Sequence, residues 1–319
     1  MYSAFDGENM KRGLTAAVVI AGLGLLGLSR SPGSLMRIVM TLERGRAGLT
    51  EHHVTIDGLD IAYTDGGDGP VILMVHGFNA DKDHWTRAAA GLTDAYRVVA
   101  LDLPGFGEST RDDAISHDPV RQAARLKAFH DALGLSAVHL VGNSMGGEIS
   151  GIYATRYPED VTSLALINAA GVASPTPSAL SGMVAEGQNP LIASSAEEYD
   201  ALLDFVFVEK PWVPGVVIDH LAAIAVDNRA FTAGVWADLR AHPSGLEAEL
   251  ATITAPTLVL WGDTDRVLDV SMASVFDAGI PDSAVIIMSE TGHLPMIERP
   301  AEFTQHLRDF LAQRAQTSR

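Results

Sequence analysis

The sequence predicts an α/β protein with a mostly parallel central sheet and helices on both faces. Short apolar runs of strand length recur along the chain and alternate with helix-length segments, which is the pattern of a parallel sheet. This alternation stops over residues 171–250, where no strand run of this type occurs. We expect that interval to form a helical cap above the carboxyl ends of the strands, where open α/β sheets bind ligands.

The expected elements follow in chain order. Residues 54–56 and 61–63 flank Asp57-Gly58-Leu59-Asp60 and predict a hairpin. A glycine-rich turn at 66–70 then leads to a fully apolar run, as expected of a strand buried on both faces. The expected strands after the hairpin are 71–75, 98–101, 138–141, 163–167, 257–261 and 284–288. The expected helices are 121–133, 148–157, 271–278 and 301–313.

Composition excludes several classes of function. The chain has 319 residues, of which 47% are apolar and 19% charged, so it can bury a large core. It has no cysteine, which excludes disulfides, thiolate zinc sites and a cysteine nucleophile. Residues 1–50 carry a net charge of +3 and the remainder −21. Nucleic acid and anionic lipid would repel so acidic a body, so nucleic acid is not an expected partner, and membrane contact is expected only of the basic leader.

The leader contains an apolar run at 14–28, with Lys11 and Arg12 before it and Arg30 after it. As a helix, 13–29 would span roughly 25 Å, slightly less than the ~30 Å of a hydrocarbon core. A cleaved signal peptide lacks a good cleavage site here, and a core helix is unexpected so far before the first strand. We therefore predict an uncleaved signal-anchor and membrane association, at the inner membrane of a bacterium. Basic residues on both sides of the run leave the orientation open.

A second helix is expected after Pro32, capped by Ser34. Its apolar residues share one face and are Leu35, Ile38, Val39 and Leu42. Such a segment could lie in a membrane interface or pack on the enzyme body, and both alternatives stay open. The predicted organisation is an anchor and amphipathic segment at 1–50, a catalytic core at 51–170 and 251–319, and a cap at 171–250.

A Gly-x-Ser-x-Gly motif follows the predicted strand at 138–141 and precedes a helix-length segment. Glycines beside the apex let the chain turn sharply from strand to helix. Ser144 is at that apex, where its hydroxyl would be presented at the carboxyl end of the strand. The motif alone is also found in ordinary turns, but this context favours a nucleophile.

Ser144 needs a base and an acid, and both are expected after later strands. His293 follows the last strand run and is the predicted base. For the acid, the 261–270 segment offers Asp265, Asp263 and Asp269. Asp265 is preferred, because Asp263 directly follows a glycine and is placed to stabilise the turn. The chain order Ser144, Asp265, His293 is that of an acyl-transfer triad.

Two backbone N–H groups are expected to stabilise the oxyanion, those of Phe78 and Met145. Phe78 lies in the loop after the 71–75 strand, and Met145 follows the nucleophile. We interpret His76 and Asp102 as structural members of turns. No dinucleotide, P-loop or zinc pattern is present, so neither a cofactor nor a metal is expected.

These motifs identify the chain as similar to a known family. The segments on which this similarity rests are HGFNADKDHW at 76–85, GNSMGG at 142–147, WGDTDRVLDV at 261–270 and GHLPMIERP at 292–300. They resemble the α/β-hydrolase family, and within it the membrane-anchored monoacylglycerol lipases and related bacterial lipases and esterases. The resemblance covers most of 50–315. It implies the same triad, and a membrane segment before the catalytic domain.

The predicted function is hydrolysis of carboxylic esters, of monoacylglycerols or similar medium-chain lipids, through an acyl-enzyme. Some apolar cap residues are expected to line an acyl pocket. The candidates are Leu202, Leu203, Phe205, Val206, Phe207, Val208, Trp212, Val213, Val216, Val217 and Ile218. Two alternatives remain. Carbon–carbon bond hydrolases share the Gly-Asn-Ser-Met-Gly-Gly elbow but usually carry a different loop after His-Gly, and some proteins of this fold bind ligands without turnover.

Overall fold

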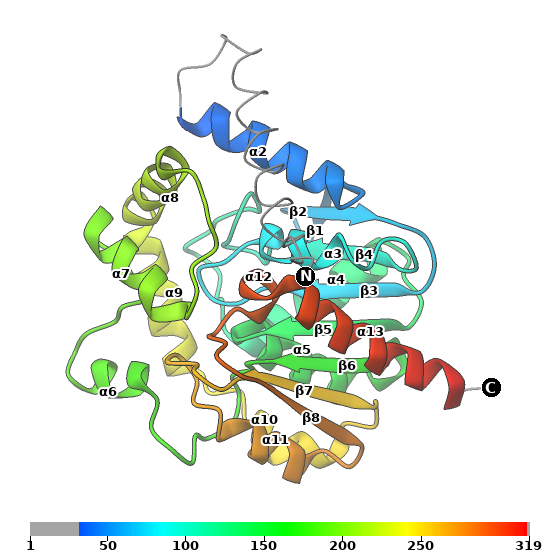
Figure 1. Cartoon of the computed structure of the whole chain (residues 1–319). Coiled ribbons are helices and arrows are strands. Elements are labelled where there is room, and N and C mark those ends of the chain that lie inside the picture. Colours follow the sequence, from blue (N-terminus) through cyan, green and yellow to red (C-terminus); the bar gives the residue numbers. More distant parts are fainter. Residues whose placement is uncertain (1–31, 318–319) are drawn as a thin grey trace, which may run out of the picture.

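The computed structural model describes residues 32–317, and the predicted apolar leader helix at 13–29 lies outside them. One sheet of eight strands runs through the protein in the order β1-β2-β4-β3-β5-β6-β7-β8 (Figure 1). The strands are β1 (Leu49–Ile56), β2 (Leu59–Gly66), β3 (Val71–Val75), β4 (Arg97–Leu101), β5 (Val138–Asn143), β6 (Val161–Ile167), β7 (Thr257–Gly262) and β8 (Ser283–Met288).

The sheet is mostly parallel. Strands β3 to β8 run parallel to one another, while β1 and β2 form an antiparallel hairpin whose second strand pairs antiparallel with β4. Asp57 and Gly58 close the hairpin, both with positive φ (51° and 81°), so Ile56 pairs with Leu59. The predicted fold class is confirmed, and the observed strands other than β3 are longer than the expected ones, most of all β1, which begins at Leu49 and not at residue 54.

Helices cover both faces of the sheet. They are α2 (Pro32–Arg46), α3 (Thr86–Ala89), α4 (Pro119–Ala132), α5 (Met145–Arg156), α6 (Ala179–Ala185), α7 (Ala196–Val206), α8 (Gly215–Asp227), α9 (Arg229–Ala241), α10 (Leu246–Glu249), α11 (Met272–Gly279), α12 (Pro295–Glu298) and α13 (Pro300–Thr317). Three short 3-10 helices are η1 (Lys82–Trp85), η2 (Pro158–Asp160) and η3 (Leu250–Thr252). Helix α4 begins two residues earlier than expected because the Asp118 carboxylate accepts the Arg121 N–H at 2.9 Å.

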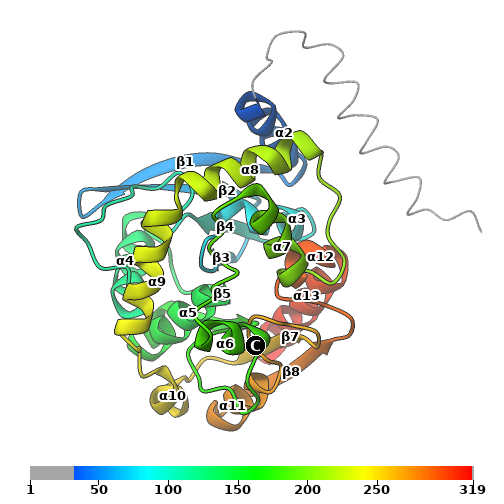
Figure 2. The same ribbon diagram turned by 90° about the vertical axis from the view of Figure 1, so that its left-hand side faces the viewer.

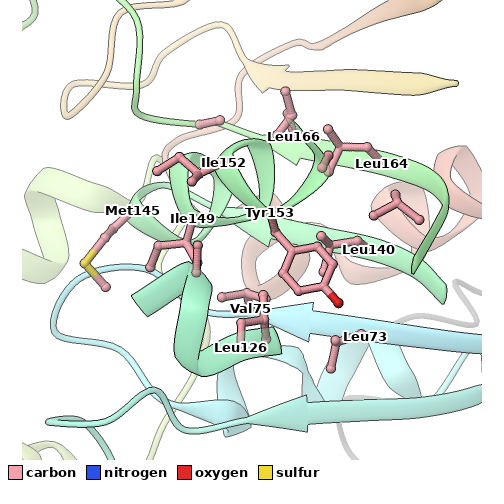
Figure 3. Close-up of a cluster of buried hydrophobic side chains, with 14 of the residues drawn as sticks. Leu73, Val75, Leu126, Leu140, Met145, Ile149, Ile152, Tyr153, Leu164 and Leu166 are labelled. Carbon is pink, nitrogen blue, oxygen red and sulfur yellow. The ribbon is translucent and has the colours of Figure 1, made fainter. Parts of the chain in front are cut away.

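Strand β3 shows why its five apolar residues need cover on both sides. Leu73 and Val75 point to the face covered by α4 and α5, where they join a cluster with Leu126 and Ile149 (Figure 3). Ile72 and Met74 alternate to the other face and pack in a second cluster with side chains of α3 and α13. The central strand is thereby fixed between two cores, which gives the loops at its carboxyl end a rigid base.

Helices α6 to α9 lie between β6 and β7 in the chain. They stand beyond the carboxyl ends of the parallel strands (Figure 1). Viewed from that side, they lie in front of the strand ends (Figure 2). The interval without strand signals is therefore helical, as expected.

Helix α2 begins at Pro32, so Ser34 lies within its first turn, and the expectation that Ser34 caps the helix was wrong. Proline suits a first helical position because its missing N–H would have no helical partner there. The helix packs along α8 and against β1, and none of its residues is fully buried. Within residues 32–317, no helix has the length and apolar character needed to span a membrane.

Candidate active site

Ser144 forms the sharp turn between β5, which ends at Asn143, and α5, which begins at Met145. Its φ of 56° and ψ of −122° are unfavourable for a residue with a side chain. A Cβ added at Gly142 would collide with the carbonyl oxygen of Gly146, and one added at Gly146 would collide with the backbone of β3. The two glycines therefore allow the turn, and the turn presents Ser144 at the carboxyl edge of the sheet.

Asp265 and His293 form a buried pair. The Nδ1 atom of His293 lies 2.8 Å from Oδ2 of Asp265, and the two residues are only 6% and 8% exposed. The other oxygen of the carboxylate, Oδ1, accepts the backbone N–H groups of Val267 at 2.8 Å and Leu268 at 3.1 Å. The carboxylate therefore engages Nδ1 of His293 and leaves the other ring nitrogen, Nε2, outside this contact.

Asp263 and Asp269, the alternative acids, occupy other positions. The Asp263 carboxylate accepts the hydroxyl of the following threonine at 2.8 Å, and that of Asp269 accepts the N–H two residues further on at 3.0 Å. Neither contacts His293 within the described part of the chain. Of the three candidates, the structure brings only Asp265 to the imidazole.

Asn168 is a member of this cluster that the sequence interpretation missed. It directly follows β6, with a φ of 44°, and its Nδ2 donates to Oδ2 of Asp265 at 2.7 Å. The same amide lies 3.4 Å from the carbonyl of Gly292, the residue before the imidazole. The available signal was an asparagine at the end of a buried strand, where a side chain faces the ligand-binding edge.

The loop that carries His293 is fixed on three sides. The His293 N–H donates to the carbonyl of Val206 at 2.9 Å, at the end of α7. The Gly292 N–H donates to Glu298 at 3.0 Å. The Asn143 side chain donates to the His293 carbonyl at 3.3 Å, which brings the His293 loop to the residue beside Ser144. The Asp265–His293 pair therefore lies at the same edge of the sheet as the Ser144 turn, and Asn143 joins the two loops.

The backbone N–H groups of Phe78 and Met145 are both available at this edge. Met145 is the first residue of α5, so its N–H has no partner within the helix. Neither N–H donates a hydrogen bond within residues 32–317. The loop of Phe78 lies against Ser144, since a Cβ added at Gly77 would be 2.9 Å from the Cβ of Ser144.

His76 is fully buried and joins two turns. Its Nε2 accepts the Leu103 N–H at 2.9 Å, so Nδ1 carries the proton and donates to the carbonyl of Gly77 at 2.7 Å. Burial disfavours the charged imidazolium and lowers the pKa of His76 to about 4. A neutral histidine with both nitrogens engaged fits the structural role predicted for it.

Asp102, also interpreted as structural, lies fully buried just after β4. Its carboxylate accepts three hydrogen bonds, from the N–H of Lys82 at 2.6 Å, the Nζ of Lys82 at 2.9 Å and the N–H of Glu108 at 2.8 Å. Burial raises the pKa of Asp102, while the charge of Lys82 opposes that shift. These bonds fasten the loop after β4 to η1.

A cavity of about 1010 Å³ adjoins the Phe78 loop and lies between α2, η1, α8 and α9. Asn79 and Ala80, which follow Phe78, line it together with Phe106. The expected pocket candidates that line it are Trp212, Val213 and Val217. Those that instead pack against the core are Leu202, Leu203, Phe205, Val206 and Phe207. The loop between α7 and α8, and α8 itself, therefore supply apolar side chains to the cavity wall, while Ser144, Asp265 and His293 are not among the described residues that line it.

Among residues 32–317, no group of three or more histidine, aspartate or glutamate side chains is arranged to hold a metal ion.

Comparison with known proteins shows the class. Residues 70–205 match the model of the alpha/beta hydrolase fold. The chain is 33% identical to Lipase 1 of Psychrobacter immobilis over 298 residues, covering 90% of this chain and 93% of that protein. It is 32% identical to monoacylglycerol lipase ABHD6 of Homo sapiens, with 88% of each chain covered. The chain belongs to the α/β-hydrolase family.

A solved structure gives the same result over almost the whole chain. The crystal structure of a membrane phospholipase A, described as a bacterial virulence factor, superposes with a TM-score of 0.89. The two sequences are 46% identical, and the match covers 96% of this chain and 99% of the other. This protein is a hydrolase of the lipase and esterase branch of the family.

Proposed function

We propose that this hydrolase is a serine carboxylester hydrolase in which Ser144 is the nucleophile, His293 the general base and Asp265 the residue that orients the base. The observation that carries the proposal is the Asp265–His293 hydrogen bond of 2.8 Å, held at the same sheet edge as the strained Ser144 turn. Strain of this kind persists only where the surrounding structure imposes it, and it is concentrated at functional sites.

In the proposed mechanism, Nε2 of His293 takes the proton of the Ser144 hydroxyl as the oxygen attacks the ester carbonyl. The carbonyl oxygen becomes an oxyanion and accepts the N–H groups of Phe78 and Met145. His293 then gives the proton to the leaving alcohol, and an acyl-enzyme remains on Ser144. A water molecule, deprotonated by His293, attacks the acyl carbon, the bond to the Ser144 oxygen breaks, and that oxygen takes the proton back from His293 as the acid is released.

The proposed substrates are lipid esters such as monoacylglycerols or similar medium-chain esters. Two observations support this choice. The related proteins are named lipases and monoacylglycerol lipases. The cavity beside the Phe78 loop has a partly apolar wall and a volume of about 1010 Å³, enough for a flexible acyl chain. In this proposal, 171–250 is a cap over the catalytic core of 51–170 and 251–319.

We also propose that residues 1–50 hold the enzyme at a membrane, the inner membrane of a bacterium. Three large apolar side chains of α2, α8 and the loop before α8 are exposed, as a surface that contacts lipid would require. They are Leu42, Trp212 and Val216, which are 41%, 65% and 41% exposed. The solved relative at 46% identity is named a membrane phospholipase A. Deleting residues 1–33 should move the protein from the membrane to the soluble fraction. A full-length protein that stays soluble without detergent would refute the anchor.

The experiment that tests the esterase is hydrolysis of p-nitrophenyl butyrate by Ser144→Ala. We expect loss of turnover, with the folded state retained as judged by thermal unfolding. Turnover at the wild-type rate would contradict the assignment. A panel of monoacylglycerols of varied chain length, run beside a carbon–carbon bond hydrolase substrate, separates the proposed reaction from the alternative that shares this elbow.

A further inference from the structure

Helix α2 is fastened to the segment after the Phe78 loop by Arg44. The Nε and Nη2 atoms of Arg44 donate to the two oxygens of Asp83, in η1, at 2.7 Å and 2.5 Å. Arg44 also pairs with Glu51 of β1. The side chains of Arg44 and Asp83 are each only 14% exposed. A two-bond contact between a guanidinium and a carboxylate fixes orientation as well as distance, so α2 and η1 are held in one relative position.

A second ionic contact holds η1 from its other side. Lys82, next to Asp83, is fully buried, and its Nζ donates to Asp102 at 2.9 Å and to Glu108 at 2.5 Å. The Nη2 atom of Arg44 lies 3.7 Å from the same Glu108 oxygen, so the two contacts form one network. Helix η1 is therefore clamped between α2 and the loop that follows β4.

Only three residues separate this clamped helix from the proposed oxyanion donor Phe78. The first, Asn79, has a left-handed backbone with a φ of 56°, and the third, Asp81, caps η1 by accepting the Asp83 N–H at 2.9 Å. On the other side of Phe78, Gly77 already packs on Ser144 without room for a Cβ. Because so few residues connect η1 to Phe78, a shift of η1 is expected to move the Phe78 N–H as well.

We propose that Arg44 is a positioning residue for hydrolysis: by pairing with Asp83 it sets the Phe78 N–H against Ser144, so that α2 is part of the oxyanion site. This inference rests on the proposed serine mechanism, because it requires an oxyanion at that place. The alternative is that the pair has a structural role alone, in which removing one partner destabilises the fold by leaving the other charge unpaired.

The two roles differ in kinetics. An oxyanion donor acts on charge that develops only in the transition state, and removing one costs ~10²–10³ in kcat. A donor displaced by a loosened loop should cost less, about 10-fold to 100-fold. KM should change little, because the bound ester carries no developed charge. A pair that serves stability alone would lower the unfolding temperature and leave kcat of the folded enzyme intact.

The test uses the full-length chain and p-nitrophenyl butyrate, a short ester that needs no membrane. Arg44→Ala and Asp83→Asn should each lower kcat about 10-fold or more, with KM within twofold of wild type. The double variant should lose no more than either single variant, because the pair acts as a unit. Arg44→Lys, which keeps the charge without the two-bond contact, should recover part of kcat. Arg46→Ala is the matched control, since Arg46 is on the same helix but is 43% exposed.

A kcat within twofold of wild type for folded Arg44→Ala would overturn the inference, as would a loss confined to KM. If Arg44→Ala does not fold, Arg44→Lys and Asp83→Asn decide by the same criteria. A fluorophosphonate probe separates this inference from the proposed function. If the wild type is not labelled at Ser144, the serine mechanism itself fails. If wild type and Arg44→Ala are labelled at equal rates, only the positioning role fails.

Discussion

The side-chain amide of Asn168 lies 2.7 Å from Oδ2 of Asp265, the same oxygen that accepts a hydrogen bond from Nδ1 of His293. A hydrogen bond to a charged group contributes about 1.5–3 kcal/mol. Asn168 is therefore expected to hold the carboxylate in the orientation that the imidazole requires.

Asn168→Ala should lower kcat for p-nitrophenyl butyrate about 10-fold without abolishing turnover, because Asp265 keeps its two backbone donors. Asn168→Asp should be at least as impaired at neutral pH, since a second carboxylate would repel the first. Gln305→Ala is the control, because the exposed Gln305 amide donates to Asp309 on α13 and does not line the cavity. Wild-type kcat in both Asn168 variants would show that Asp265 does not need the hydrogen bond from Asn168.

The turn at Ser144 should be intolerant of a methyl group beside it. Gly142→Ala places a Cβ against the Gly146 carbonyl and should lower both the unfolding temperature and the activity. Gly234→Ala is a matched control in α9, where an added Cβ meets no atom within 4 Å. There alanine should raise stability by about 0.5–1 kcal/mol. Differential scanning calorimetry of both variants checks this pair, and equal effects would refute the steric account.

His76 should make stability depend on pH. Its pKa is 6.5 in the unfolded chain and about 4 in the folded protein, so the unfolded state binds the proton more readily. The contribution of neutral His76 is complete above pH 6.5 and is lost as pH falls towards 4, by about 3 kcal/mol in total.

Urea denaturation at pH 7.5, 5.5 and 4.5 measures this effect. The wild type should lose stability over that range more steeply than His76→Gln, which has no imidazole to protonate. Parallel pH profiles for the two proteins would contradict the assignment.

The exposed apolar side chains proposed to contact a membrane can be replaced without changing the cavity wall. Leu42 and Val216 are each 41% exposed and do not line the cavity. A Leu42→Ser, Val216→Ser double variant should bind less to lipid vesicles and hydrolyse soluble p-nitrophenyl butyrate at the wild-type rate. A matched control replaces Val285 and Ile287 of β8 by serine, since these are equally exposed on another part of the molecule. Equal vesicle binding by both variants would refute a membrane contact through Leu42 and Val216.

Much of this molecule could be predicted from local patterns. The apolar run at 71–75 predicted β3, and glycines around Ser144 predicted the turn, because both depend on residues adjacent in the chain. Asp265 was preferred over Asp263 and Asp269 from its place in the loop, and it is the one that contacts His293.

Contacts between distant segments could not be predicted in the same way. Asn168 meets Asp265 across 97 residues, and Arg44 meets Asp83 across 39. Those pairings depend on strand order in the sheet and on where α2 packs, neither of which leaves a periodic signal in the sequence. Which cap residues line the cavity likewise depends on how α8 and α9 pack, and the sequence carries no local signal for that packing.

The central claim is that Ser144 is an activated nucleophile, and covalent labelling tests it most directly. The full-length protein is treated with a fluorophosphonate probe, digested and analysed by mass spectrometry. We predict one phosphonyl adduct, located on the peptide that contains Ser144, and none in Ser144→Ala or after the probe is added to unfolded protein. An unlabelled wild type, or a label that persists in Ser144→Ala, would contradict the account.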